Sequence, residues 1–172
     1  MKIKNTGFTL IELLIVIALL GALAVGLLAT VDPFEQLKKG TDTSIRNTTS
    51  EVYNSAIRYY SVKNTFAWTG DITGISLGDA SFTNSPSGYL QQIISAGELK
   101  PEFIQLAGGN LNSIFLTSTA NAGVRQNVSV CFLPQSKSFA NEANAKYGVN
   151  GIVSAGCLAT VAGGTACYWC VK

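Results

Sequence analysis

One long apolar segment near the start of the chain limits what this protein can be. Residues 8–31 form a run of 24 residues in which Glu12 is the one ionisable side chain. As an α-helix at about 1.5 Å per residue, the run is about 36 Å long, enough to span a bilayer with some tilt. Lys2 and Lys4 precede it. The pattern predicts a transmembrane helix whose N-terminal end stays in the cytoplasm while the C-terminal part is exported.

The position of Glu12 indicates more than a plain membrane anchor. A secretory signal peptide has a shorter apolar region with its cleavage site behind it, whereas the processing point expected here lies before the run. A carboxylate within a membrane costs about 2.5–3.5 kcal/mol even on lenient scales. A cut after Gly7 would place a new amine on Phe8, one helical turn from Glu12. The alternative is an anchor whose Glu12 extends toward the lipid headgroups.

Residues 7–17 read Gly-Phe-Thr-Leu-Ile-Glu-Leu-Leu-Ile-Val-Ile. This segment resembles the type IV prepilin processing and assembly motif, which is shared by pilins and by the pseudopilins of type II secretion. The resemblance implies that a prepilin peptidase cleaves after Gly7 and that Phe8 becomes the N-methylated first residue. It also implies that Glu12 neutralises the amine of a neighbouring subunit, and that the apolar helices form the core of a filament.

The chain departs from that family at one point. Many members have a helix-kinking proline near position 29, where this chain has Ala29 and places Pro33 later. The site at which the helix bends in a filament is therefore open.

A second helical pattern occupies residues 32–63. Residues that recur every three or four positions predict one buried face, made of Phe34, Leu37, Thr41, Ile45, Thr48, Val52, Ala56 and Tyr59. The opposite face is polar, with Glu35, Lys38, Lys39, Asp42, Arg46 and Asn47. Pro33 and Gly40 are expected bends.

Residues 64–172 read as a globular head. Residues 64–86 are rich in glycine and predict a loop with a short strand at 66–68, followed by short helices at 87–96 and 101–107. Strands are expected at 113–118, 125–133, 147–153 and 165–171, with Val128, Val130 and Phe132 on one face. The predicted fold is α+β and pilin-like. The expected parts are a leader (1–7), a transmembrane and filament-core helix (8–31), the second half of the helix (32–63) and the head (64–172). The second half of the helix is expected to pack on an antiparallel sheet of about three or four strands.

All four cysteines, Cys131, Cys157, Cys167 and Cys170, lie in the part expected to be exported. An even number in an oxidising compartment favours disulfides. If the last strand contains Cys167 and Cys170, their side chains point to opposite faces and a bond between them would be strained. We therefore expect each to join either Cys131 or Cys157, in an order that the sequence leaves open. A thioredoxin-like CxxC would need a βαβ setting, and a zinc site usually needs a second CxxC.

Composition argues against several function classes. Charged residues are 13% of the chain and histidine is absent, which removes the commonest general base and metal ligand. Without residues 1–7 the acidic and basic side chains balance, so nucleic acid is not the expected partner. No enzyme, cofactor or metal site is predicted. Asn47 and Asn127 begin Asn-x-Ser/Thr patterns, which are short and often accidental.

Three functional hypotheses remain. The first is a structural type IV pilin that waits as a single-pass protein in the inner membrane and polymerises with other subunits into a surface filament for adhesion, motility or DNA uptake. The second is a pseudopilin of a type II secretion system. The third is a minor pilin that binds DNA or a surface. The resemblance implies prepilin peptidase, an inner-membrane assembly platform and membrane lipid as partners.

Overall fold

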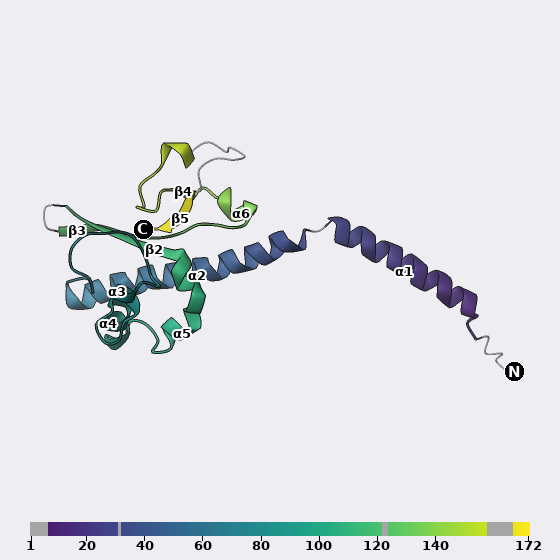
Figure 1. Ribbon diagram of the computed structural model, residues 1–172, viewed down its shortest axis with the longest axis horizontal. Helices are drawn as coiled ribbons and strands as arrows, with labels where there is room; N and C mark the ends of the chain where they lie inside the picture. The colour runs from purple at the N-terminus through teal and green to yellow at the C-terminus, as the bar shows by residue number, and fades with distance from the viewer. Residues whose placement is uncertain (1–6, 31, 122–123, 158–166) are drawn as a thin grey trace. The chain divides into compact units, whose positions relative to one another are not determined.

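A computed structural model describes residues 7–30, 32–121, 124–157 and 167–172 (Figure 1). The chain divides into two compact units, Met1–Leu37 and Lys38–Lys172. The first contains an apolar helix and the start of a second helix. The second contains the rest of that helix and an antiparallel sheet.

Helix α1 (Leu10–Thr30) fills most of the apolar segment. Its stretch Leu10–Leu28 is long and apolar enough to cross a membrane. Every side chain of α1 whose placement is described is exposed. An apolar helix with no buried face needs lipid or other helices around it, which is what the sequence predicted for this segment.

Helix α2 (Pro33–Lys63) begins with a well-defined N-terminal cap. The carboxylate Oδ1 of Asp32 accepts hydrogen bonds from the backbone N–H groups of Phe34 at 3.1 Å and Glu35 at 3.3 Å. Pro33 occupies the first helical position, where a missing N–H costs nothing. Gly40, an expected bend, lies within the helix and does not end it.

The buried face of α2 differs from the predicted one in its first half. Ile45, Val52 and Ala56 are buried as expected. Phe34 and Leu37 are instead 74% and 69% exposed. Asp42, which the sequence placed on the polar face, is fully buried. The buried residues are Asp42, Ile45, Thr49, Val52, Ser55 and Ala56, so the face starts at a carboxylate.

Asp42 tolerates burial because three donors surround it. Its oxygens accept hydrogen bonds from the backbone N–H of Gln135 at 3.0 Å and from the N–H and hydroxyl of Ser136 at 2.8 and 2.6 Å. Ser136 in turn caps the short helix α6 (Lys137–Ala140). The carboxylate thus fixes α2 to the chain segment that leaves the sheet, since a buried charge is stable only when it is hydrogen-bonded.

The sheet has five antiparallel strands in the order β1-β2-β3-β5-β4, where the sequence predicted three or four. The strands are β1 (Ile72–Ser76), β2 (Ile114–Asn121), β3 (Val124–Phe132), β4 (Ala145–Tyr147) and β5 (Tyr168–Val171). β1 was expected to be loop. Its pairing with β2 shifts register between Ile72 and Ile75, and Gly74 between them has φ of +61°. This irregularity interrupts the alternation that signals a strand.

Two further strand predictions were wrong. Residues 66–68 form no strand, and the rings of Phe66 and Trp68 stack instead. The strand expected at 147–153 ends at Tyr147. Beyond it, Gly148 and Gly151 form a tight turn in which the Gly151 N–H donates to the Gly148 carbonyl. Turn glycines of this kind end a strand, because the backbone reverses there.

Short helices complete the head. The predicted helices at 87–96 and 101–107 are confirmed as α4 (Tyr89–Ser95) and α5 (Phe103–Ala107). The sequence did not predict α3 (Ala80–Thr83) or α6. Two 3₁₀ turns lie at Gly108–Ser113 and Ala155–Cys157.

The core forms where the inner face of the sheet meets α2. Val128, Val130 and Phe132 of β3 are buried, as their alternation predicted. They share one hydrophobic cluster with Ile45 and Val52 of α2. The molecule is therefore α+β and pilin-like, with an apolar N-terminal helix and a second helix packed on an antiparallel sheet.

Candidate processing and assembly site

Gly7 and Phe8 lie just before the first turn of α1, and neither is helical. The Phe8 side chain is 83% exposed, and a Cβ added to Gly7 would meet no atom within 4 Å. Exposed, non-helical chain with a small residue is where proteases act most readily. The predicted cleavage point is therefore accessible.

Thr9 and Glu12 close a reciprocal cap at the start of α1. Glu12 Oε2 accepts hydrogen bonds from the backbone N–H of Thr9 at 2.8 Å and from its hydroxyl at 2.7 Å. The Thr9 hydroxyl oxygen accepts from the backbone N–H of Glu12 at 3.3 Å. This is the capping box, in which a threonine and a glutamate three residues later satisfy each other's free N–H groups.

The capping box gives Glu12 hydrogen-bond partners within its own chain. Two donors of Thr9 share its carboxylate, which also lies at the positive end of the helix dipole. Neither donor carries a charge. These two hydrogen bonds therefore do not neutralise the group, and it can still pair with a cation.

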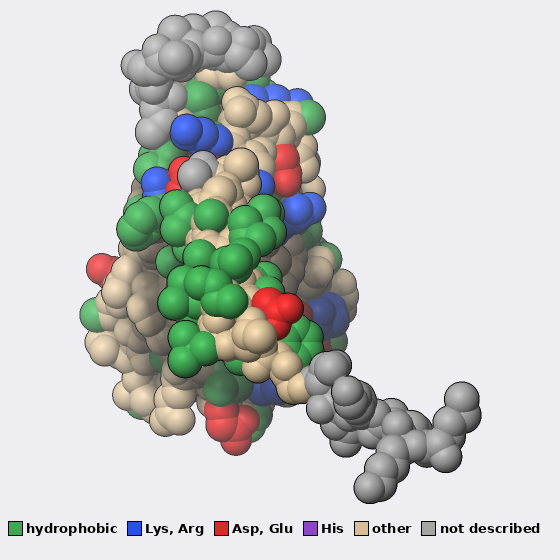
Figure 2. All heavy atoms as spheres, turned by 90° about the vertical axis from the view of Figure 1, so that its right-hand side faces the viewer, with side chains coloured by type: hydrophobic (Ala, Val, Ile, Leu, Met, Phe, Trp, Pro, Cys, Tyr) green, Lys and Arg blue, Asp and Glu red, His purple; other side chains and the backbone are tan. Residues whose placement is uncertain are grey.

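The rest of α1 has no charged group. Its 21 residues correspond to a helix about 31 Å long. Figure 2, in which the α1 end of the chain faces the viewer, shows hydrophobic side chains gathered on this end. Because Glu12 is the single carboxylate, at one end of this helix, a partner charge must lie at the same end of the helix to pair with it.

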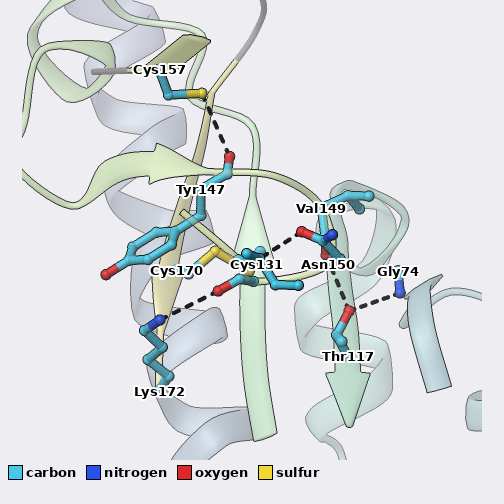
Figure 3. Close-up of a disulfide and its surroundings, with 11 residues drawn as sticks. Gly74, Thr117, Cys131, Tyr147, Val149, Asn150, Cys157, Cys170 and Lys172 are labelled. Atoms are coloured by element: carbon cyan, nitrogen blue, oxygen red, sulfur yellow. Dashed lines mark hydrogen bonds between the residues drawn. A yellow bond between two sulfur atoms is a disulfide. The ribbon is translucent and has the colours of Figure 1, made fainter. Parts of the chain in front are cut away.

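Each cysteine of the head takes part in a disulfide. Cys131 of β3 bonds to Cys170, its register partner on β5, with the two Cα atoms 4.1 Å apart. Cys157 bonds to Cys167 with a Cα separation of 5.6 Å. Figure 3 shows the first of these bonds between the two strands. The C-terminal segment is thus joined both to the centre of the sheet and to the chain just before it.

The sequence reasoning named Gly7, Phe8 and Glu12 but overlooked Thr9. A threonine three residues before a glutamate, at the head of an apolar run, is a recognisable local signal. Among the residues that the structure describes, no three His, Cys, Asp or Glu side chains gather as a metal site would require.

The N-terminal segment also matches a known family model. Residues 2–28 match the prokaryotic N-terminal methylation motif, a stretch that includes Gly7, Phe8 and most of α1. No curated protein and no solved structure matches the chain. The motif is the signature of type IV pilins and pseudopilins, which are structural proteins, and it implies processing by a prepilin peptidase and assembly with other subunits. The chain therefore carries the N-terminal signature of type IV pilins and pseudopilins.

Proposed function

We propose that this chain is the structural subunit of a type IV pilus. A prepilin peptidase cuts after Gly7, the amine of Phe8 is methylated, and the mature chain polymerises into an extracellular filament. One observation carries the proposal. Glu12 is a single carboxylate in the first turn of an exposed helix that is otherwise uncharged.

Cleavage supplies the charge that Glu12 needs. The amine created on Phe8 lies next to Thr9, whose backbone N–H already donates to Glu12 Oε2 at 2.8 Å, so a small movement of the non-helical end would bring the amine to the carboxylate. Opposite charges in contact attract each other, and the attraction grows as water is excluded. It offsets part of the cost of a carboxylate in the membrane, so processing makes the membrane-embedded N-terminus more tolerable.

The same pair can set the stagger between subunits. If the Phe8 amine of one chain meets Glu12 of its neighbour, the helices match only at one axial offset. The exposed apolar surface of α1 then packs against other helices instead of lipid. Polymerisation thus places the Glu12 carboxylate of each subunit beside a Phe8 amine, and the apolar surface of each α1 beside that of another α1.

The orientation follows from the ends of the apolar segment. Lys2 and Lys4 favour the cytoplasmic side, and two disulfides in the head suit an oxidising compartment. The subunit is thus a single-pass protein of the inner membrane before assembly, with its head outside the cytoplasm.

Mass spectrometry of filaments sheared from the cell surface tests the proposal. The expected subunit begins at Phe8, carries one methyl group on its amine and contains two intact disulfides. Long sheared fibres distinguish a pilus from a short periplasmic pseudopilus. Filaments built from chains that still begin at Met1 would contradict the processing step.

A further inference from the structure

A groove lies beside β3 in the head. Its cavity has a volume of about 870 Å³ and lies between α2, strands β2 and β3 and the loop that follows β4. Exposed apolar side chains stand on both walls: Ile57 of α2 is 38% exposed, and Ile152 and Val153 of the loop are 65% and 46% exposed. A preformed, largely apolar hollow of this size is suited to receive a side chain of a partner.

The loop wall is held in place by the sheet. Thr117 of β2 donates to the Val149 carbonyl at 3.1 Å and accepts from the Gly74 N–H at 2.8 Å (Figure 3). Gly151 has φ of +69°, and a Cβ there would meet the Ser129 hydroxyl. The glycine lets the loop lie directly on β3, so the groove does not depend on a partner to form.

One charge marks the groove. Lys172 is the only charged side chain among the described residues that line it. Its ammonium donates to the Gly151 carbonyl at 3.3 Å and lies 4.3 Å from the centre of the Tyr147 ring. These contacts fix a positive charge beside an apolar hollow, which favours a partner with an apolar side chain next to an acid.

The complementary surface occurs on the same chain. Leu106 of α5 is 77% exposed, the highest value for a large hydrophobic side chain among the described residues of Lys38–Lys172. Glu102 lies one helical turn before it and is also exposed. Among the residues that the structure describes, Glu102 forms no ion pair. In Figure 1, α5 and β4 lie on opposite sides of α2.

We propose that Leu106 of one subunit inserts into this groove of a second copy, with Glu102 paired to Lys172. The proposal rests on the filament function and identifies a contact between heads. Leu106 and the groove lie on different surfaces of the head. The contact is therefore heterologous and repeats from copy to copy. Such a contact builds an open helical assembly unless its rotation closes a ring. A second copy is thus the occupant that both the charge match and the filament require.

Charge reversal in the full-length chain tests the pair. Glu102→Lys and Lys172→Glu each place like charges together and should lower the yield of sheared filaments about twofold to fivefold. The double variant restores the opposite charges and should return the yield to near that of the wild type. A double variant no better than the worse single variant overturns the pairing.

Leu106→Asp tests the apolar contact, and Gln105→Asp is its matched control on the exposed side of the same helix. We expect the first to lower filament yield about tenfold and the second to leave it unchanged. Resistance of the membrane pool to trypsin verifies that each variant folds. Equal yields for the two variants contradict the proposal.

A photo-reactive benzoylphenylalanine at position 106 locates the contact within assembled filaments. The expected cross-link joins it to Ile57, Ile152 or Val153 of another copy. Filaments of this variant that form but cross-link elsewhere contradict this contact alone. A wild-type chain that forms no filaments contradicts the proposed function itself.

Discussion

Two carboxylates on apolar helix faces show how differently the two units of this chain are stabilised. Asp42 is fully buried in the head, and three donors from residues 135–136 satisfy it. Glu12 is exposed on α1, and its hydrogen bonds come from Thr9, three residues away. The first carboxylate is satisfied within one chain. Among the described residues the second has no counter-charge, which makes it suited to join chains.

The surroundings of the two groups follow the same division. The head has a hydrophobic core, two disulfides and a five-stranded sheet. The described side chains of α1 are all exposed. A protein interior gains its stability from burial, so the head stabilises itself while α1 depends on lipid or on other helices. The comparison predicts that changes to Glu12 affect assembly, and that changes to Asp42 affect folding.

Glu12→Ala is expected to have the largest effect on assembly. It removes the charge that we propose pairs with the Phe8 amine, so filament yield should fall at least about tenfold. Membrane insertion should persist, because alanine makes α1 more apolar. Immunoblots of sheared filaments and of the membrane pool measure both quantities. A normal fibre yield would exclude the charge-pair mechanism.

Asp42→Ala should instead destabilise the head by about 3 kcal/mol, because it leaves three buried donors without an acceptor. Urea unfolding of the full-length chain in detergent measures the change. Thr43→Ala is the control, because Thr43 directly follows Asp42 in α2 and its side chain is exposed. It should change stability by less than about 0.5 kcal/mol. If both variants unfold at the same urea concentration, Asp42 does not fix α2 to the sheet.

The sequence predicted those features whose signal is local. The apolar segment, Glu12, the inner face of β3 and the short helices α4 and α5 each depend on residues a few positions apart. Asp42 was assigned to the wrong face, because its partner Ser136 lies 94 residues away in the sequence. No periodicity reveals such a contact. β1 was overlooked for a different reason, since Gly74 breaks the alternation on which strand prediction depends.

The cysteines show the same limit. Their number and compartment predicted disulfides, and alternation along a strand argued against a bond between Cys167 and Cys170. Which of them bonds to Cys131 is decided by the register of β3 and β5, where Cys131 lies opposite Cys170. Strand register between distant segments is a tertiary property, so the sequence left the pairing open.

Removing each disulfide in turn compares the effect of a long closed loop with that of a short one. Cys131–Cys170 spans 39 residues and Cys157–Cys167 spans 10. Loop-closure entropy predicts losses of about 4 and about 3 kcal/mol for the two paired Cys→Ser variants. Urea unfolding in detergent ranks them. A larger loss for the short loop would show that these disulfides do not stabilise the head chiefly by constraining the unfolded chain.

Thr9→Ala tests the cap of α1 separately from the charge of Glu12. The variant loses the two hydrogen bonds of the Thr9 hydroxyl and keeps the one from the Thr9 backbone N–H to Glu12, a cost of about 1 kcal/mol to the first helical turn. Amide exchange at residues 9–12 in detergent micelles should become about fivefold faster. Thr9→Ser keeps the hydroxyl and should exchange like the wild type. Identical exchange in the alanine variant would mean that the cap does not hold this turn.

The smallest effect is expected at Asp79, the N-terminal cap of α3 in the head. The Ser81 backbone N–H, and then its hydroxyl, donate to the carboxylate and lower the pKa of Asp79 below its usual value. A carboxyl with a lowered folded-state pKa contributes stability above its unfolded pKa of about 3.9 and loses it as pH falls through the folded value. Urea midpoints of the wild type should therefore fall between pH 5 and 3 slightly more than those of Asp79→Asn. The asparagine still caps α3 but does not titrate. Parallel pH profiles for the two chains would show that this carboxylate contributes nothing through its charge.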